Sequence, residues 1–258
     1  MIYVLLPAFN EAENLGGLLE TLAEEYATWA ASTPGGAAPA LEAVVVDDGS
    51  SDDTAEVARH FQGEIRVQLL EHETNQGLGA ALLTGLRSIL SRCGSQDVIV
   101  SLDADGTHHP RYIFPMVERI LAGKSIVVAS RFAPGGKEHG VSLIRKLLSR
   151  GARLVYRLFY PELPLRDFSC GFRAFRAEAL QTTWQEWGDR LFERPGFACT
   201  GELMLKTLVH VPASQIEEVP FELQYERKQG VSKMPALQTI RGTIELLIEA
   251  RGWRKHHE

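Results

Sequence analysis

The sequence predicts an α/β protein built on a mostly parallel sheet with helices on both faces. Short apolar runs rich in Val and Ile alternate with segments of helical periodicity through the first half of the 258-residue chain. These runs have the length of strands, and they lack the alternation of apolar and polar residues seen in a strand with one solvent-exposed face. Polar residues follow each run, at the carboxyl ends where parallel sheets bind their ligands.

Taken in order, the expected strands are 2–6, 42–46, 66–70, 98–102 and 126–129, and the helices between them are 14–30, 52–61, 78–90 and 110–121. The second half is less regular. We expect helices at 141–159, near 174–184, at 201–209 and at 236–251, and a strand at 216–223. Two segments rich in small residues, Gly and Pro, are expected to be loops: 32–40 as a mobile insertion and 133–140 as a flexible loop.

Composition and charge narrow the class of protein. Hydrophobic residues make up 45% of the chain and charged residues 23%, which is typical of a globular protein and excludes a disordered one. The net charge of −6 argues against a nucleic-acid partner. The three cysteines are far apart, and the opening apolar run is too short for a signal peptide. We therefore expect a cytoplasmic protein whose contact with a membrane is peripheral.

An acidic pair follows the fourth expected strand. Asp103 and Asp105 flank Ala104 directly after the run VIVSL. Two carboxylates at a strand end can share one Mg²⁺ or Mn²⁺, which prefer oxygen ligands and often bind substrate phosphates as well. The same residues could instead cap a helix or close a turn. The pair alone does not decide between these two interpretations.

A second acidic group and a glycine segment follow earlier strands. Asp47 and Asp48 follow the run EAVVV directly, where an acid can accept a hydrogen bond from a nucleotide base or ribose. A second metal site is a weaker alternative. The segment 75–79 is Asn-Gln-Gly-Leu-Gly, which lacks the third glycine of a dinucleotide fingerprint and the Lys of a P-loop. We interpret it as a tight turn into a helix.

Together these segments resemble family-2 glycosyltransferases of the GT-A fold, in the branch of dolichol-phosphate mannose synthases and other polyprenyl-phosphate enzymes. The matching motifs occur in the family's order: LLPAFNEAENL, VVVDDGSSDDT, NQGLGAALLTGL, SLDADGTHHP, ASRF, RDFSCGFRAFRAEAL and EVPFELQYERKQGVSKM. The resemblance covers nearly the whole chain. It implies a GT-A catalytic domain over 1–225, with acceptor-side helices near its end. It also implies a donor-closing basic loop and an amphipathic helix over 226–258.

The resemblance also implies which residues bind the donor, a nucleoside-diphosphate sugar such as GDP-mannose or UDP-glucose. Thr107 stands where many members carry Gln as a further ligand of Mg²⁺ or Mn²⁺, and a bridging water suits its shorter side chain. The implied donor residues are Pro7, Phe9 and Glu11 around the base, Val46 and Asp48 at the base and ribose, Asp103, Ala104 and Asp105 at the metal and diphosphate, and Arg131, Arg227 and Lys233 at the diphosphate.

For the acceptor, the resemblance implies that Arg131, Arg145 and Ser149 hold the phosphate of a polyprenyl or dolichyl lipid. Such a phosphate is already ionised near neutral pH, so it needs alignment rather than a strong base. Asp167 is the candidate base if the acceptor is a hydroxyl group. It could equally form a structural hydrogen bond with Arg166 or a loop amide. The implied catalytic residues are Asp105, Arg131 and Asp167.

Three hypotheses for function follow. The first is an inverting, metal-dependent transfer of mannose or glucose to polyprenyl phosphate, with the chain bound at the cytoplasmic membrane face or to a membrane partner. The second keeps the reaction and makes a sugar or protein hydroxyl the acceptor, with Asp167 as base. The third is a nucleotide-sugar-binding subunit without catalysis. A nucleotidyltransferase fits poorly, because PAFNE occupies the place of its Gly-rich, Arg-bearing loop.

Overall fold

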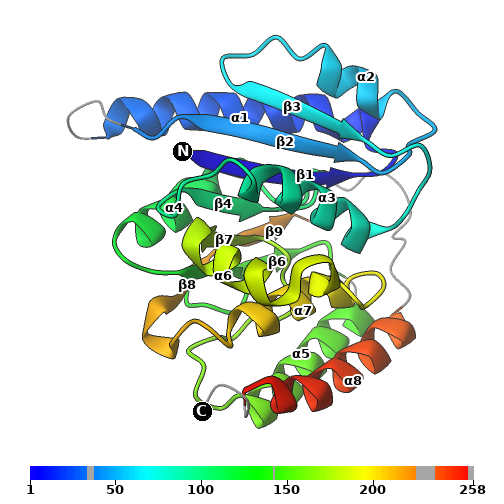
Figure 1. Ribbon diagram of the computed structural model, residues 1–258, viewed down its shortest axis with the longest axis vertical. Coiled ribbons are helices and arrows are strands. Elements are labelled where there is room, and N and C mark those ends of the chain that lie inside the picture. The colour runs from blue at the N-terminus through cyan, green and yellow to red at the C-terminus, as the bar shows by residue number, and fades with distance from the viewer. Residues whose placement is uncertain (34–37, 142, 225–235, 255–258) are drawn as a thin grey trace.

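The computed structural model describes residues 1–33, 38–141, 143–224 and 236–254. Within these residues, seven strands form one sheet in the order β3-β2-β1-β4-β7-β5-β8 (Figure 1). Their bounds are β1 Ile2–Ala8, β2 Leu41–Asp47, β3 Arg66–Glu71, β4 Val98–Ser101, β5 Ile126–Ser130, β7 Arg173–Arg176 and β8 Ile216–Pro220. The predicted α/β class and mostly parallel sheet are confirmed.

The direction of the strands places the functional loops on one rim. Strands β3, β2, β1 and β4 are parallel neighbours, while β7 runs antiparallel to both β4 and β5. Since β4 and β5 oppose the same strand, they run in the same direction. The carboxyl ends of β1, β2, β4 and β5 therefore lie at one edge of the sheet, as the sequence predicted for a ligand site.

Helices cover both faces of the sheet. Their bounds are α1 Ala12–Ser32, α2 Thr54–Arg59, α3 Leu78–Leu90, α4 Ile113–Leu121, α5 Leu143–Phe159, α6 Ala177–Trp187, α7 Ala198–Thr207 and α8 Ala236–Arg254. Short 3-10 turns occur at Pro110–Tyr112, Gly188–Leu191 and Ala213–Gln215. Helices α1 and α4 pack together through Trp29 and Phe114, whose ring centroids lie 5.0 Å apart, while α3 contacts α6 and α7. Helix α8 lies beside α5 (Figure 1).

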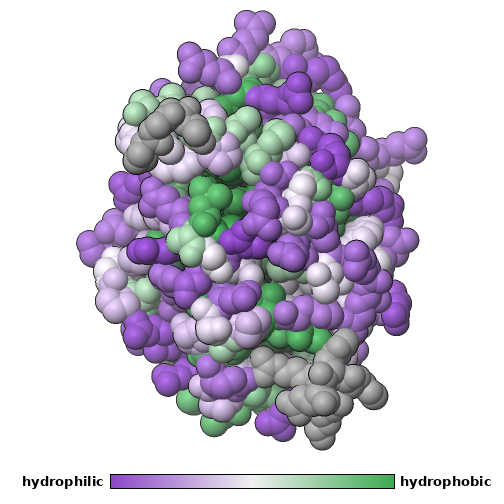
Figure 2. Space-filling view, turned by 60° about the vertical axis from the view of Figure 1, so that its left-hand side comes forward, coloured by the Kyte–Doolittle hydropathy of each residue, from purple (hydrophilic) through white to green (hydrophobic). Residues whose placement is uncertain are grey.

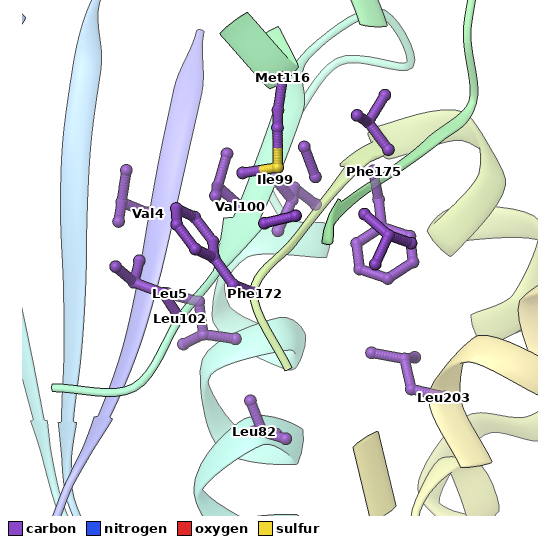
Figure 3. Close-up of a cluster of buried hydrophobic side chains, with 14 of the residues drawn as sticks. Val4, Leu5, Leu82, Ile99, Val100, Leu102, Met116, Phe172, Phe175 and Leu203 are labelled. Carbon is purple, nitrogen blue, oxygen red and sulfur yellow. The ribbon is translucent and has the colours of Figure 1, made fainter. Parts of the chain in front are cut away.

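The core lies between the sheet and these helices. Val4 of β1, Val100 of β4 and Phe175 of β7 are almost fully buried, with Met116 of α4 and Leu203 of α7 packed around them (Figure 3). Burying each such side chain contributes about 1.5–3 kcal/mol to folding before entropy is counted. The surface in Figure 2 is mostly hydrophilic, with smaller hydrophobic areas between the charged groups. No helix in the described part of the chain combines the length and apolar composition needed to cross a bilayer.

Three predictions about the second half were wrong in part. The segment expected to be a helix near 174–184 begins as strand β7, which is inserted between β4 and β5, and its helix runs over 177–187. The expected flexible loop at 133–140 contains strand β6, Lys137–His139, which pairs with β9, Glu222–Gln224. The strand expected at 216–223 is accordingly two strands in different sheets, separated at Phe221. Of the loop expected at 32–40, residues 34–37 lie outside the described residues.

Candidate active site

The loops after β1 and β2 are joined by hydrogen bonds. Asn10 has a φ of 56°, in the left-handed region that Asn tolerates better than most residues. Its amide donates to Ser50 Oγ at 2.9 Å, and its Oδ1 accepts from the Ser51 amide at 2.8 Å. The amide of Glu11 donates to Thr54 Oγ1 at 2.8 Å. These bonds fix the backbone between Phe9 and Glu11, which are half-buried at this rim, as is Pro7 at the end of β1.

The predicted base-contacting pair at the end of β2, Val46 and Asp48, is buried. Val46 is fully buried within the sheet. Both carboxylate oxygens of Asp48 accept backbone hydrogen bonds, from the Gln76 amide at 2.9 Å and the Gly77 amide at 2.8 Å. Asp48 also lies 2.7 Å from Nδ1 of His72. Asp48 thus holds the turn before α3, and its contact with a nucleotide stays a prediction.

The acidic pair after β4 is shaped by its own turn. Oδ1 of Asp105 accepts from the Thr107 amide at 3.1 Å and from Thr107 Oγ1 at 2.6 Å, and both residues are buried. The hydroxyl of Thr107 therefore orients Asp105. Asp103 is half-buried, and a Cβ added to Gly171 would lie 4.0 Å from its Oδ1. Buried Ala104 separates the two acids.

The loop that carries Asp103 and Asp105 suits a divalent cation whose remaining ligands come from a bound diphosphate and from water. Asp103 and Asp105 offer carboxylate oxygens at a rim, the donor type that Mg²⁺ and Mn²⁺ prefer. Among the described residues, no group of three or more His, Cys, Asp or Glu forms a complete metal cage. Two protein carboxylates supplemented by diphosphate oxygens and water are what Mg²⁺ commonly uses. The His108 ring is buried against Phe172 and Phe221, and its Nδ1 lies 3.4 Å from the Asp103 amide nitrogen.

The guanidinium of Arg131 is held by Asp167. Nε donates to Oδ2 at 2.7 Å, Nη2 donates to Oδ1 at 2.8 Å, and the Arg131 amide donates to Oδ2 at 3.2 Å. Nη2 also reaches Ser169 Oγ at 2.7 Å, and Nη1 lies 3.3 Å from Glu138 Oε1. As a structural residue, Asp167 is expected to bond to Arg166 or to a loop amide. The loop amide is found, that of Arg131, and the charged partner is the Arg131 guanidinium rather than Arg166.

The ion pair determines the protonation of Asp167. The carboxylate is 1% exposed. Burial by itself would raise the pKa of Asp167, but the charge and hydrogen bonds of Arg131 outweigh burial and hold that pKa below its ordinary value. Asp167 likewise raises the pKa of Arg131, against the opposing effect of burial. A carboxylate with a lowered pKa that accepts two bonds from a guanidinium and a third from a backbone amide is a weak proton acceptor.

The same short segment connects Arg131 with the acidic pair. Asp167 binds Arg131, and Gly171 lies close to Asp103. Four residues of chain reach at most about 14 Å. Phe168 within this segment stacks on Tyr156 of α5, with centroids 4.6 Å apart and planes at 8°. The acidic pair, Arg131 and α5 are therefore neighbours on one rim.

A basic hollow of about 550 Å³ opens beside Arg131. Two guanidiniums lie over the Phe132 ring, with that of Arg131 5.2 Å and that of Arg153 5.5 Å from the ring centroid. The ring thus holds two positively charged guanidiniums at the same hollow, each in a favourable cation–π contact. Five cationic side chains and one acid, Glu138, line this hollow; the cations are Arg131, Lys137, Arg150, Arg153 and Arg157.

Four predicted residues are only partly described or lie outside the structure. Ser149 is half-buried on α5. Arg145 lies on the first turn of the same helix, and its side chain is not among those described. Arg227 and Lys233 lie outside the described residues. Their roles at the acceptor and the donor stay predictions.

Sequence reasoning missed several residues that shape the site. Arg173 is 2% exposed, and its Nη2 donates to the Phe168 carbonyl at 2.8 Å, which fixes the segment bearing Asp167. Burial lowers the pKa of Arg173. His72 braces Asp48, and Glu138 faces Arg131. The alternation of charged and apolar residues in RAFR, 173–176, was a signal for β7 and its buried arginine, but no local signal pointed to His72 or Glu138.

Comparison with known proteins gives a consistent result. The family model for glycosyl transferase family 2 matches residues 3–184. A dolichol-phosphate mannosyltransferase from Pyrococcus furiosus is 31% identical over 90% of this chain and 59% of its own length. A polyprenol monophosphomannose synthase from Mycolicibacterium smegmatis is 30% identical over 90% of this chain and 80% of its own. The chain therefore spans a little over half of the Pyrococcus relative and most of the other.

Solved structures show the same fold at lower identity. Glucosyl-3-phosphoglycerate synthase from Mycobacterium tuberculosis, solved with Mn²⁺, UDP and glucosyl-3-phosphoglycerate, aligns with a TM-score of 0.63 and 21% identity, covering 98% of this chain and 80% of that one. Mannosyl-3-phosphoglycerate synthase from Rubrobacter xylanophilus aligns with a TM-score of 0.64 and 19% identity, covering 99% and 75%. The predicted GT-A fold is confirmed.

Proposed function

Because the chain belongs to glycosyl transferase family 2, we propose that it moves a hexose, mannose or glucose, from a nucleoside diphosphate to a polyprenyl or dolichyl phosphate. The observation that carries this proposal is the combination of an acidic pair and a basic hollow on one rim of the sheet. The acids suit the cation and diphosphate of the donor. The arginines suit an acceptor that is itself an anion. The mannosyltransferase names of the relatives at 30% identity support the same reaction.

On the donor side, we assign the diphosphate and its cation, Mg²⁺ or Mn²⁺, to Asp103 and Asp105. A bound cation supplies charge stabilisation for the departing diphosphate. The Asn10 and Asp48 hydrogen bonds make the base-binding rim rigid before the donor arrives, so less ordering is required on binding. Arg227 and Lys233 complete this assignment as the basic residues that close over the diphosphate.

On the acceptor side, the phosphate is assigned to Arg131, with Arg145 and Ser149 on α5. The ion pair with Asp167 fixes the plane of the Arg131 fork. A fixed fork can align a phosphate oxygen behind the anomeric carbon without reorganising during the reaction. Direct in-line attack by that oxygen, with no covalent intermediate, inverts the anomeric configuration. No general base is needed, because the attacking oxygen is already ionised.

The hydroxyl-acceptor alternative is less well supported. It requires Asp167 to accept a proton, and the Arg131 ion pair lowers the pKa of that carboxylate. A non-catalytic binding subunit would have no physical need for the Arg131 and Asp167 pair beside the acids. We therefore retain lipid phosphate as the acceptor. We also propose that residues 1–225 carry catalysis, that 226–258 supply the closing loop and α8, and that the chain works at the cytoplasmic membrane face.

The test pairs two donors with two acceptors. The chain is incubated with Mn²⁺ and either GDP-mannose or UDP-glucose, and with either polyprenyl phosphate or a free sugar acceptor. We expect one donor to yield a sugar–phosphate lipid of inverted configuration. Transfer to the free sugar alone would contradict the proposal. A thermal-shift panel of nucleoside diphosphates with Mn²⁺ identifies the base independently of the acceptor, because a ligand that binds only the folded state raises its stability.

A further inference from the structure

A second hollow adjoins the first along helix α5. Its volume is about 580 Å³, and it shares Arg153 and Arg157 with the hollow beside Arg131. Arg166 and Glu218 line it from other segments, and apolar side chains such as Leu163 complete its wall. The proposed transfer assigns no ligand to it.

The charge of this second hollow is strongly positive. Three guanidiniums line it against one carboxylate. That carboxylate, Glu218, already accepts hydrogen bonds from the amides of Arg166 and Asp167, at 2.5 and 2.8 Å. Over the described ranges, no carboxylate forms an ion pair with Arg153, Arg157 or Arg166. Clustered guanidiniums without carboxylate partners favour a phosphate, whose oxygens match their fork.

The surroundings of the hollow favour a phosphate carried by a lipid. Leu154 and Leu158 follow the two shared arginines and lie one turn apart on α5, with 62% and 67% of their surface exposed. Helix α8 packs beside α5 and exposes Ile244 and Ile248. A soluble phosphate would gain nothing from these exposed apolar groups. Large apolar side chains next to arginines are typical of a helix that lies in the membrane interface.

We propose that the second hollow binds the headgroup phosphate of an anionic membrane phospholipid, which is not consumed in the reaction. The shared arginines place this phosphate next to the basic hollow assigned to the acceptor. A membrane lipid bound here would orient the chain so that the first hollow faces lipid phosphates. The proposal goes beyond the proposed transfer, because it assigns a binding site that can be tested with neither donor nor acceptor present.

The test measures co-sedimentation with vesicles of phosphatidylcholine alone or with phosphatidylglycerol as about a third of the lipid. Arg166→Gln changes only the second hollow, and Arg157→Gln changes both. Arg66→Gln is the control, because Arg66 is 76% exposed on β3, at the opposite edge of the sheet. Each of the three changes removes one positive charge. We expect the Arg166 and Arg157 variants to bind the anionic vesicles about five-fold more weakly, and the Arg66 variant to bind like the unaltered chain.

Equal weakening in all three variants, or unchanged binding in the Arg166 and Arg157 variants, would overturn the proposal. So would equal binding to phosphatidylcholine alone. Arg166→Lys keeps the charge but not the fork, so it should bind more weakly than the unaltered chain and more tightly than Arg166→Gln, and it guards against a folding defect. Free glycerol phosphate distinguishes the source of the ligand. If it stabilises the unaltered chain but not the Arg166→Gln variant at millimolar concentration, the hollow takes a soluble phosphate and the lipid is wrong. Failure of sugar transfer would leave all these readings unaffected.

Discussion

Replacing Asp167 by Asn distinguishes a residue that positions Arg131 from one that accepts a proton. The carboxylate is buried and accepts three hydrogen bonds from Arg131 and one from Ser169. Asn keeps one acceptor oxygen but turns an amide donor toward the guanidinium. Removing one partner of a buried ion pair costs about 3–5 kcal/mol, and the remaining acceptor favours the lower end. For a chain of this size, about 3 kcal/mol corresponds to a fall of about 6–12 °C in the thermal midpoint.

The pH dependence of this loss has a definite sign. The folded-state pKa of Asp167 is lowered, so its ion pair contributes stability above the ordinary carboxylate pKa of about 4, and this contribution is lost as the pH falls through the folded value. The difference in thermal midpoint between the unaltered chain and Asp167→Asn should therefore be full at about pH 7 and shrink below about pH 4. Ser169→Ala is the matched control, with an expected loss of about 0.5–1.5 kcal/mol for its hydrogen bonds.

Kinetics complete this experiment. As a positioning residue, Asp167 should affect the KM for the acceptor as well as kcat, and the pH profile of kcat should keep its shape in the variant. A general base would give a loss of about 10²–10⁴-fold in kcat and the disappearance of the acid limb of the profile. An Asp167→Asn chain that keeps its thermal midpoint and loses the acid limb would refute the positioning role and favour a hydroxyl acceptor.

Three further changes test other parts of the structure. Thr107→Val should weaken Mn²⁺ binding about ten-fold, measured by calorimetry, because Asp105 loses the hydroxyl that orients it. Thr107→Ser keeps the hydroxyl and should not weaken it. Equal Mn²⁺ affinities of the Val and Ser variants would contradict this role of Thr107. Gly49→Ala should lower the free energy of unfolding by more than about 1–3 kcal/mol, because Gly49 has a φ of +69° and an added Cβ would lie 2.4 Å from the Thr74 carbonyl carbon. Gly17→Ala has open space and is the control, which should be neutral or stabilising in the same urea titration. Lys206→Met should cost about 3 kcal/mol, because the buried ammonium donates to Glu202 at 2.7 Å and contacts the Trp187 ring; a change below about 1 kcal/mol would contradict that role.

The regular part of the fold was predictable because burial leaves a direct mark on sequence. Strands β1, β4 and β5 are apolar runs with almost every residue buried, and α3 begins and ends where its periodicity predicts, at Leu78 and Leu90. Strand β7 was missed because a charged residue, Arg173, occupies a central strand. Its two bonds to backbone carbonyls, which only the tertiary structure provides, make that burial tolerable.

The site was predictable where it depends on strand ends and unpredictable where it depends on long-range pairs. Asp103 and Asp105 follow a recognisable strand, so their place on the rim could be inferred. The bond between Arg131 and Asp167 joins residues 36 apart in the chain, and the insertion of β7 beside β5 brings the two together. Arginines recur along the sequence of α5, so a basic helix could be expected there. The hollow they line depends on where the Phe132 ring lies, which no sequence pattern encodes.

The most direct test asks whether the acids and arginines of one rim act together in the transfer. It measures the transfer of labelled hexose to polyprenyl phosphate by the unaltered chain and by Asp105→Ala, each with and without Mn²⁺. We expect the unaltered chain to form the lipid product only with the cation, and the variant to lose at least about 100-fold in kcat while keeping its fold. Equal turnover by the two chains, or transfer by the unaltered chain that ignores the cation, would contradict the assignment of the donor diphosphate to these acids.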